Sequence, residues 1–175
     1  QTTPANQPTI VEGGSLVTGG IDFDGVDDTL VTDSPVITDT FSAAMVSYEE
    51  TVAAGGPFFS QHQDSVANRF SFTQSPSGGK YRFFKDGASP NAIDSTTNIA
   101  TDFQLSFITK SGVAVGMYFN GGTNEGGNLG SSDILSAKLS IAAADEGGNA
   151  FRATAIKELI IYPSDQSDNR TAIEA

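Results

Sequence analysis

Short segments in which every second residue is apolar, separated by turn-forming residues, constrain this chain more than any other feature. In 69–73 Phe70 and Phe72 alternate with polar residues, and 113–119 carries an apolar residue at every second position. Side chains of a β-strand point alternately to its two faces, so a period of two indicates half-buried strands. With 19 glycines supplying turns between such segments, the pattern predicts an all-β chain.

Further strand candidates lie at 139–142, 155–162 and 103–108; in the last, Phe103, Leu105 and Phe107 share one face. Roughly ten to twelve strands result, spaced about 8–12 residues apart, which favours an antiparallel two-sheet sandwich over βαβ units. The segment 41–48 is largely apolar on both faces and is predicted to be covered on both sides.

Turns and ends can be assigned in the same way. Gly19-Gly20 predicts a hairpin between Leu16–Val17 and Ile21–Phe23. Pro163 ends the last strand, because proline cannot donate a hydrogen bond to a central ladder. The helix-tolerant residues 170–175 predict a short C-terminal helix.

Composition restricts the partners of the chain. A formal charge of −12 without a basic cluster excludes binding to nucleic acid or an anionic membrane surface. No apolar run approaches the roughly 20 residues that span a bilayer, so no membrane insertion is expected. The absence of cysteine excludes disulfides and Cys-based zinc sites.

The length of 175 residues predicts one domain, over residues 10–175, preceded by an extended arm or linker at 1–9. Because no initiator Met is present, the sequence is expected to be a processed form or an excised piece. Its C-terminus is expected to be truncated, since it stops just after the start of a helix.

Three segments carry a family resemblance. Ile21–Asp28 resembles the "FDGxxD" first strand of concanavalin A-like, laminin G-like domains, Val115–Gly121 resembles their "vyvNG" strand and turn, and Ala155–Tyr162 resembles their closing strand. Their order and spacing extend the resemblance from about Ile21 to Ala175. It implies a jelly-roll sandwich with a short helix after the closing strand.

The two ends resemble a narrower subgroup. Ala5–Val11 and Tyr162–Ala175 are similar to jelly-roll domains of bacteriophage and prophage proteins. That resemblance implies a virion surface module for capsid decoration, a head fibre or a tail fibre, with other virion proteins and host-surface glycans as partners. It also implies a homo-oligomer, often a trimer. Residues 141–148 replace the "iG" turn of many relatives, so no ligand loop is carried over there.

Catalytic groups are sparse. The single histidine, His62, lies in a polar segment, and no Gly-x-Ser-x-Gly elbow accompanies it. Asp22, Asp24 and Asp27 mimic the Glu-x-Asp-x-x-Glu spacing of concanavalin A-like glycoside hydrolases. However, all three are the shorter Asp, and Gly25 interrupts the strand, so the carboxyl separation that such chemistry needs is not expected. The chain is therefore predicted not to be an enzyme.

The same region offers calcium ligands. Asp24, Asp27 and Asp28 fall within five residues, and Asn120 is expected near the same end. Carboxylate oxygens are the ligands that calcium prefers. The alternative is an ordinary turn, since Asp side chains also bond their own backbone in turns. Calcium is the only cofactor that the residues allow us to suggest.

Aromatic residues provide the other candidate site. Sugar sites present aromatic faces, and Tyr48, Tyr81, Tyr118 and Tyr162 are the amphipathic candidates, although each lies inside a predicted strand where packing also accounts for it. With glycosidase activity not expected, two non-catalytic functions remain open. One is the non-catalytic virion module, and the alternative is a carbohydrate-binding module of a secreted bacterial enzyme or adhesin, with an exposed aromatic platform or a calcium-lined face.

Overall fold

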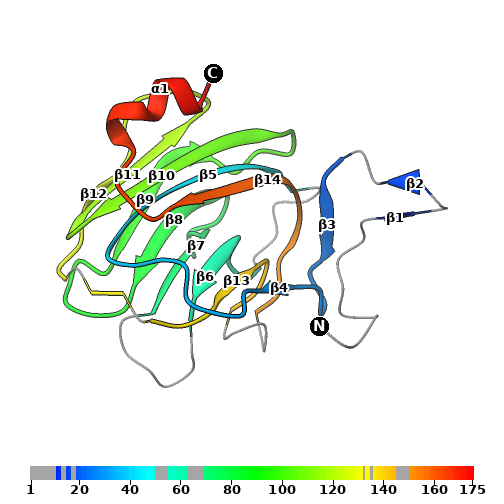
Figure 1. Ribbon diagram of the computed structural model, residues 1–175, viewed down its shortest axis with the longest axis horizontal. Helices are drawn as coiled ribbons and strands as arrows, with labels where there is room; N and C mark the ends of the chain where they lie inside the picture. The colour runs from blue at the N-terminus through cyan, green and yellow to red at the C-terminus, as the bar shows by residue number, and fades with distance from the viewer. Residues whose placement is uncertain are drawn as a thin grey trace.

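The computed structural model describes residues 11–12, 15–16, 19–49, 55–62, 69–131, 133–134, 136–144 and 150–175. Two antiparallel sheets of six strands each pack face to face (Figure 1). This confirms the all-β, two-sheet antiparallel jelly-roll sandwich with a short C-terminal helix. The predicted arm at 1–9 lies outside the described residues.

The first sheet has the order β12-β11-β10-β5-β14-β3. Its strands are β12 (Gly127–Asn128), β11 (Ala114–Phe119), β10 (Gln104–Ser111), β5 (Thr40–Tyr48), β14 (Ala153–Tyr162) and β3 (Ile21–Asp24). β5 lies between β10 and β14, and both pairings run along most of its length. A central strand of this kind needs apolar residues on both faces, as 41–48 provides.

The second sheet has the order β4-β13-β6-β7-β8-β9. Its strands are β4 (Leu30–Val31), β13 (Leu139–Ile141), β6 (Phe59–Gln61), β7 (Phe70–Gln74), β8 (Lys80–Lys85) and β9 (Ala92–Asn98). Phe70 and Phe72 are buried and Ser71 between them is half-buried, which confirms the alternation predicted for 69–73.

The hairpin predicted around Gly19-Gly20 is wrong. β1 (Val11–Glu12) pairs with β2 (Ser15–Leu16), and β3 pairs instead with β14 at the edge of the first sheet. Gly20 has φ 111°, and a Cβ there would lie 2.8 Å from the carbonyl oxygen of Ile156. The chain therefore passes closely over β14, and β3 continues along the free edge of that strand.

Aromatic rings from both sheets fill the core. Tyr81 of the second sheet stacks on Phe119 of the first, with centroids 4.6 Å apart, and on Phe72 at 5.4 Å. The Tyr81 hydroxyl donates to Gln104 Oε1 at 2.7 Å. Burial raises the pKa of Tyr81 to about 12. Tyr81 is thus a core residue, and it is unavailable as a surface sugar contact.

Three cations are also buried among the described residues, Lys85, Lys110 and Arg152. Arg152 pairs with Glu49, donates to the carbonyl oxygen of Gly56, and lies 4.2 Å from the centroid of the Phe58 ring. Burial lowers the pKa of Arg152 to about 9. Lys110 Nζ donates to the carbonyl oxygens of Asp39 at 3.0 Å and Gly112 at 2.8 Å. These contacts offset part of the desolvation cost of Arg152 and Lys110, although Arg152 Nη2 and Glu49 Oε2 have no hydrogen-bond partner among the described residues.

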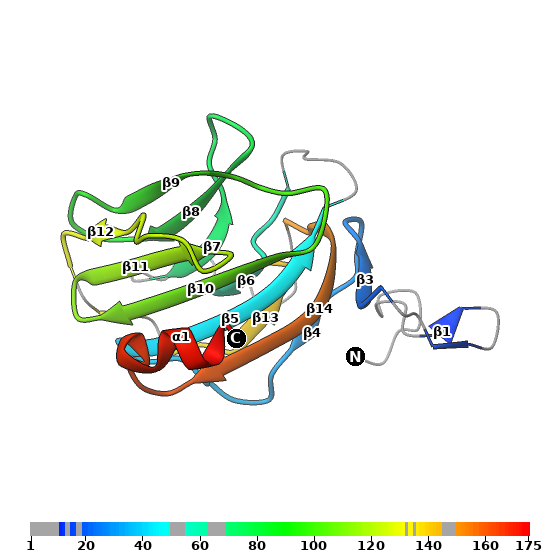
Figure 2. The same cartoon turned by 90° about the horizontal axis from the view of Figure 1, so that it is seen from above.

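A short C-terminal helix covers the outer face of the first sheet. The 3₁₀ turn η3 (Ser167–Asn169) leads into α1 (Arg170–Ile173), which lies on the side of the first sheet away from the second (Figures 1 and 2). The Gln166 amide donates to Ser42 Oγ at 2.8 Å and anchors the segment to β5. No helix within the described part of the chain is long and apolar enough to cross a membrane.

Candidate functional site

The three aspartates predicted to bind calcium do come together, in the turn between β3 and β4. One carboxylate oxygen from each of Asp24, Asp27 and Asp28 lies within 4.8 Å of the other two. Asp24 Oδ1 accepts the Val26 amide at 2.7 Å, and Asp28 Oδ2 accepts the Asp24 amide at 3.2 Å. Both interpretations, a cation site and a self-bonded turn, fit these contacts.

Asp28 is the buried member, at 5% exposure. Burial raises its pKa, and the charges of Asp24, Asp27 and Asp22 raise it further, against the lowering effect of the Asp24 amide. Gly25, at φ 78°, lets the chain turn tightly against Ala153. The carboxylates could share one divalent cation through their oxygens, and calcium at Asp24, Asp27 and Asp28 stays a prediction.

Asn120 reaches the same end of the first sheet but follows β11, four strands from β3, or about 19 Å at the usual strand spacing. Its Oδ1 accepts the Leu105 amide at 2.9 Å. Asn120, at φ 50°, and Gly121, at φ 74°, form the turn expected from the "NG" resemblance. Asn120 therefore stabilises its own turn and stands apart from the aspartates.

The candidate catalytic residues lie on β3 and in the segment after β6. Asp22 and Asp24 are exposed on either side of the buried Phe23, so they share one face of β3 as expected. His62 Nε2 lies 2.7 Å from an Arg69 guanidinium nitrogen, and Arg69 also pairs with Asp86. The described contacts of His62 therefore belong to a surface cluster that includes a cation.

The outer face of the first sheet carries the other tyrosines. On β5, Phe41, Ala43 and Met45 point into the core, so Val46 and Tyr48 point outward. Tyr118 contacts Phe107 at 6.2 Å between ring centroids, and the Arg170 guanidinium carbon lies 4.4 Å from the centroid of the Tyr118 ring. Phe107 is fully buried although it lies outside the core cluster.

The inward face of β10 was not identified from the sequence. Gln104, Ser106 and Ile108 are the residues that point into the sandwich, whereas Leu105 and Phe107 point outward. Periodicity separates two faces of a strand but does not say which one faces the core. Here the more apolar face lies outward, where α1 and neighbouring aromatic rings cover part of it.

An exposed aromatic pair, Tyr48 and Phe103, lies on this face. The two rings meet edge to face with centroids 4.7 Å apart, and Phe103 is 41% exposed. Lys157 Nζ lies 5.4 Å from the centroid of the Phe103 ring. The sequence indicates Tyr48 as a candidate sugar-binding residue, but it indicates Phe103 only as a residue of a predicted strand. Their contact depends on the pairing of β5 with β10, which no local pattern shows.

A β-bulge positions charged groups beside this pair. Ile156 of β14 faces Ser47 of β5, and Glu158 faces Val46, the neighbour of Ser47. Lys157 therefore has no facing residue on β5 and is the extra residue of the bulge. Ile156 belongs to the core, whereas Lys157 and Glu158 are both exposed. A bulge lets two consecutive side chains leave a strand on the same side. Lys157 and Glu158 therefore both reach the outer face.

A groove of about 260 Å³ lies between this face and α1. Apolar side chains and two carboxylates line it. Among the lining residues are Val46, Leu105, Ile160, Ile173, Glu158 and Glu174. The Glu174 side chain is only 6% exposed and its Oε2 accepts Arg170 NH1 at 2.6 Å. Glu174 Oε1 is buried and has no hydrogen-bond partner among the described residues. We call this the α1 groove.

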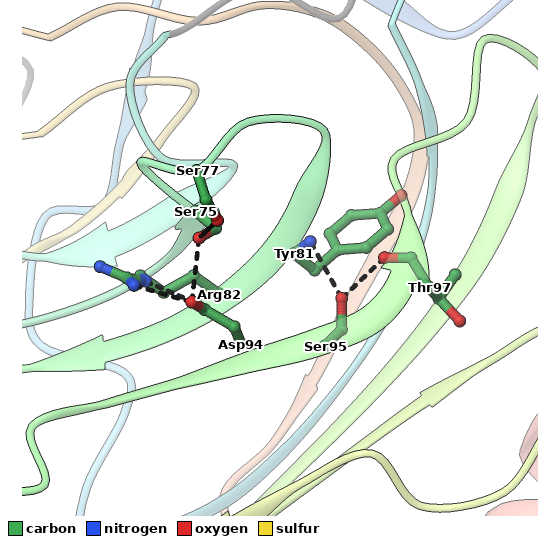
Figure 3. Close-up of polar contacts among 7 residues, drawn as sticks. All are labelled: Ser75, Ser77, Tyr81, Arg82, Asp94, Ser95 and Thr97. Atoms are coloured by element: carbon green, nitrogen blue, oxygen red, sulfur yellow. Dashed lines mark hydrogen bonds and ion pairs between the residues drawn. The ribbon is translucent and has the colours of Figure 1, made fainter.

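Around β8 and β9 of the second sheet, polar side chains bond to one another (Figure 3). Arg82 of β8 donates two hydrogen bonds to Asp94 of β9, at 2.5 and 2.8 Å. Ser75 Oγ donates to Asp94 at 2.9 Å and lies 2.8 Å from Ser77 Oγ. The hydrogen bond from Arg82 lowers the pKa of Asp94. These side chains satisfy one another.

A bulge in β9 lies next to that network and has hydrogen bonds of its own. The Tyr81 amide donates to Ser95 Oγ at 3.0 Å, and Ser95 Oγ donates to the Thr97 carbonyl at 2.7 Å (Figure 3). A side chain thus replaces a backbone acceptor where the register shifts. The adjacent Thr96 and Thr97 amides donate to Glu125, at 2.6 and 2.8 Å, which protects this edge strand.

A larger cavity of about 540 Å³ lies along Pro35–Thr40, next to Ile134 and Ser136. Its carboxylate, Asp39, accepts the Ile134 amide at 2.6 Å, and the Asp39 carbonyl accepts Lys110. The cavity therefore has polar groups that already have partners. The α1 groove is smaller but contains an unpaired one.

Comparison with known proteins identifies the fold. No protein-family model and no curated protein sequence matches the chain. Domain 4 of a GH43 extracellular arabinanase from Geobacillus stearothermophilus, in complex with arabinotriose, matches with a TM-score of 0.68 and 15% identity, over 92% of this chain and 83% of that chain. The Ruminococcus gnavus IT-sialidase CBM40, bound to α2,3-sialyllactose, matches with a TM-score of 0.63 and 8% identity, over 89% and 98%.

Trypanosoma rangeli sialidase in complex with sialic acid matches with a TM-score of 0.66 and 13% identity; this chain is covered over 90%, but it spans only 27% of that chain. At these identities the likeness concerns the fold alone. It confirms the jelly-roll sandwich expected from the sequence. The resemblance to phage proteins is not addressed by these matches and stays a prediction.

Proposed function

We propose that this chain is a non-catalytic carbohydrate-binding module of an extracellular protein. The observation that carries the proposal is the whole-domain likeness to two modules solved with oligosaccharides, one with arabinotriose and one with α2,3-sialyllactose. The chain covers 83% and 98% of those neighbours, so the likeness is to the modules themselves. One fold supports several functions, and the proposal therefore also needs a site.

The outer face of the first sheet supplies that site. Phe103 and Tyr48 offer aromatic faces to the C–H groups of a sugar ring, and Leu105, Val46 and Ile160 extend the apolar surface. Lys157 and Glu158 add one hydrogen-bond donor group and one acceptor group beside it. Apolar surface with a few convergent polar groups is typical of small-ligand sites. It is the aromatic platform that the carbohydrate-binding hypothesis requires.

The non-catalytic part of the proposal rests on the aspartate turn. Asp24 and Asp28 accept backbone amides of their own turn, and the three carboxylates crowd within 4.8 Å. Retaining glycosidases hold their two carboxyls about 5–5.5 Å apart, and inverting ones farther apart, on opposite sides of the scissile bond. Carboxylates gathered in one turn, two of which accept amides of that turn, are not arranged on opposite sides of a bound sugar.

The virion setting concerns where the module is attached. A sugar-binding face would suit a tail or head fibre that contacts host-surface glycans, and it would equally suit a secreted enzyme or adhesin. Virion partners, a virion surface location and a trimer stay predictions from the resemblance of the chain ends. Immunogold labelling of purified particles with an antibody against this chain tests them, and absence of label on the particles contradicts them.

Binding of the chain to an immobilised panel of neutral and acidic oligosaccharides, including arabinotriose and α2,3-sialyllactose, tests the function. We expect binding of at least one sugar, and at least a ten-fold weaker affinity in the double variant Tyr48→Ala/Phe103→Ala, which is about 1.4 kcal/mol. Phe84→Ala, which removes a half-buried aromatic ring from β8 of the second sheet, is the control and should bind normally. If the folded chain binds none of these sugars, the proposal is wrong.

A further inference from the structure

The α1 groove is lined by a carboxylate that is only half satisfied. Glu174 lines the groove, its Oε2 is held by Arg170, and its Oε1 is buried with no hydrogen-bond partner among the described residues. A buried acceptor without a hydrogen bond costs roughly 1–3 kcal/mol, and more for a charged group. A ligand that donates a hydrogen bond to Glu174 Oε1 would remove that cost, so the groove favours a donor.

The charges around the groove restrict the ligand further. Glu158 and Glu174 both line it, and the nearest cation, Arg170, is already paired with Glu174. Lys157 lies over Phe103, beyond the groove at the aromatic pair. An anionic group placed in the groove would face two carboxylates in a chain of net charge −12. Like charges at close range are unfavourable, particularly where water is partly excluded.

The floor of the groove sets the shape of the ligand. Val46, Leu105 and Ile160 form an apolar surface, and the outward row of β10 runs from Leu105 to Phe103 of the aromatic pair. A sugar ring has the matching character, with C–H groups on its faces and hydroxyl donors around its edge. One ring would lie in the groove while the next stacks on the aromatic pair.

We propose that the α1 groove is a binding subsite for a neutral saccharide, whose hydroxyl donates to Glu174 Oε1, and that it discriminates against acidic sugars. The proposal rests on the carbohydrate-binding function and names its ligand class. A hydrogen bond to a charged acceptor is worth about 1.5–3 kcal/mol, so its loss should weaken binding about ten-fold or more.

Isothermal titration calorimetry with arabinotriose, lactose and α2,3-sialyllactose tests the proposal on the wild-type chain and three variants. We expect a neutral sugar to bind at least ten-fold more tightly than α2,3-sialyllactose. Glu174→Gln should weaken the neutral sugar about ten-fold. Ser42→Ala removes the hydrogen bond that anchors the C-terminal segment to β5 but leaves the groove lining unchanged, so it should change the affinity less than about three-fold and controls for loosening of α1.

The double variant Glu158→Gln/Glu174→Gln tests discrimination separately, and it should reduce the ratio between neutral and acidic affinities at least three-fold. If neutral sugars bind but Glu174→Gln has no effect, or Ser42→Ala has the same effect as Glu174→Gln, the groove assignment is wrong and the carbohydrate-binding function stands. Preferred binding of α2,3-sialyllactose by the wild-type chain also overturns it. If no sugar binds at all, the function itself fails.

Discussion

The two outer faces of the sandwich differ in how completely their groups are satisfied. On the second sheet, Arg82 and Ser75 both donate hydrogen bonds to Asp94. On the first sheet, Phe103 is 41% exposed, and a buried carboxylate oxygen of Glu174 lacks a partner among the described residues.

That difference indicates where a ligand can gain free energy. A ligand on the second sheet would have to replace the charge-assisted hydrogen bonds of Arg82 and Asp94 with equally good ones. On the first sheet it would cover exposed apolar surface and supply a missing donor to Glu174. The presence of an aromatic ring does not distinguish the two faces, because Phe84 lies half-buried on the outer face of the second sheet. The distinction lies in unsatisfied groups beside apolar surface.

The largest effect should come from removing the buried aromatic ring on the outer face of the first sheet. Phe107 is fully buried although it points away from the core, so Phe107→Ala should lower the unfolding free energy by about 3–5 kcal/mol. On the outer face of the second sheet, Phe84 is only half-buried, so Phe84→Ala should cost only about 1–2 kcal/mol. Urea denaturation followed by circular dichroism measures both. Equal costs would mean that Phe107 is no better covered in solution than Phe84, which contradicts the difference between the two faces.

The sequence predicted the parts of the fold that depend on local pattern. The alternation in β7 and β11, the end of β14 at Tyr162 and the short helix after Pro163 follow from periodicity and turn chemistry. The inward face of β10 and the pairing of β3 with β14 do not, because both are decided by segments distant in the chain.

The candidate site was predictable only in part, for the same reason. Tyr48 was identified as an amphipathic aromatic residue, but its contact with Phe103 needs the register of β5 against β10. The α1 groove needs the C-terminal segment to fold back onto β5 through the bond between Gln166 and Ser42, 124 residues apart. Nothing in the sequence near Glu174 distinguishes it from an ordinary helix glutamate.

A smaller effect should separate two aspartates with opposite surroundings. The pKa of Asp28 is raised by burial and by acidic neighbours, so its ionised form destabilises the fold above that pKa. The cost shrinks as the pH falls below the raised pKa and is gone below the ordinary value of 3.8. In a buffer with chelator at pH 7, Asp28→Asn should therefore raise the unfolding free energy by about 0.5–1 kcal/mol. Its advantage should vanish in acid, in a series of urea titrations at different pH values.

Asp94→Asn is the matched control with the opposite sign. The pKa of Asp94 is lowered by Arg82, so its ionised form stabilises the fold above its ordinary value of 3.8 and this is lost as the pH falls through the lowered pKa. This variant should be less stable at pH 7 and equal to wild type in acid. A gain in thermal stability from calcium in wild type but not in Asp28→Asn would support the calcium prediction. A destabilised Asp28→Asn in chelator would contradict the electrostatic account of the turn.

The smallest effect should come from removing the extra residue of β14. Deletion of Lys157 places Glu158 directly after Ile156, and these two residues already face the adjacent residues Val46 and Ser47 of β5. A regular ladder can therefore form, and the unfolding free energy should change by less than about 1 kcal/mol. Lys157→Ala keeps the bulge but removes the cation beside Phe103, an interaction worth about 0.5–1 kcal/mol at an exposed site. If the deletion unfolds the chain whereas Lys157→Ala does not, the bulge is needed for the curvature of the first sheet, and its role extends beyond directing Lys157 and Glu158 to the outer face.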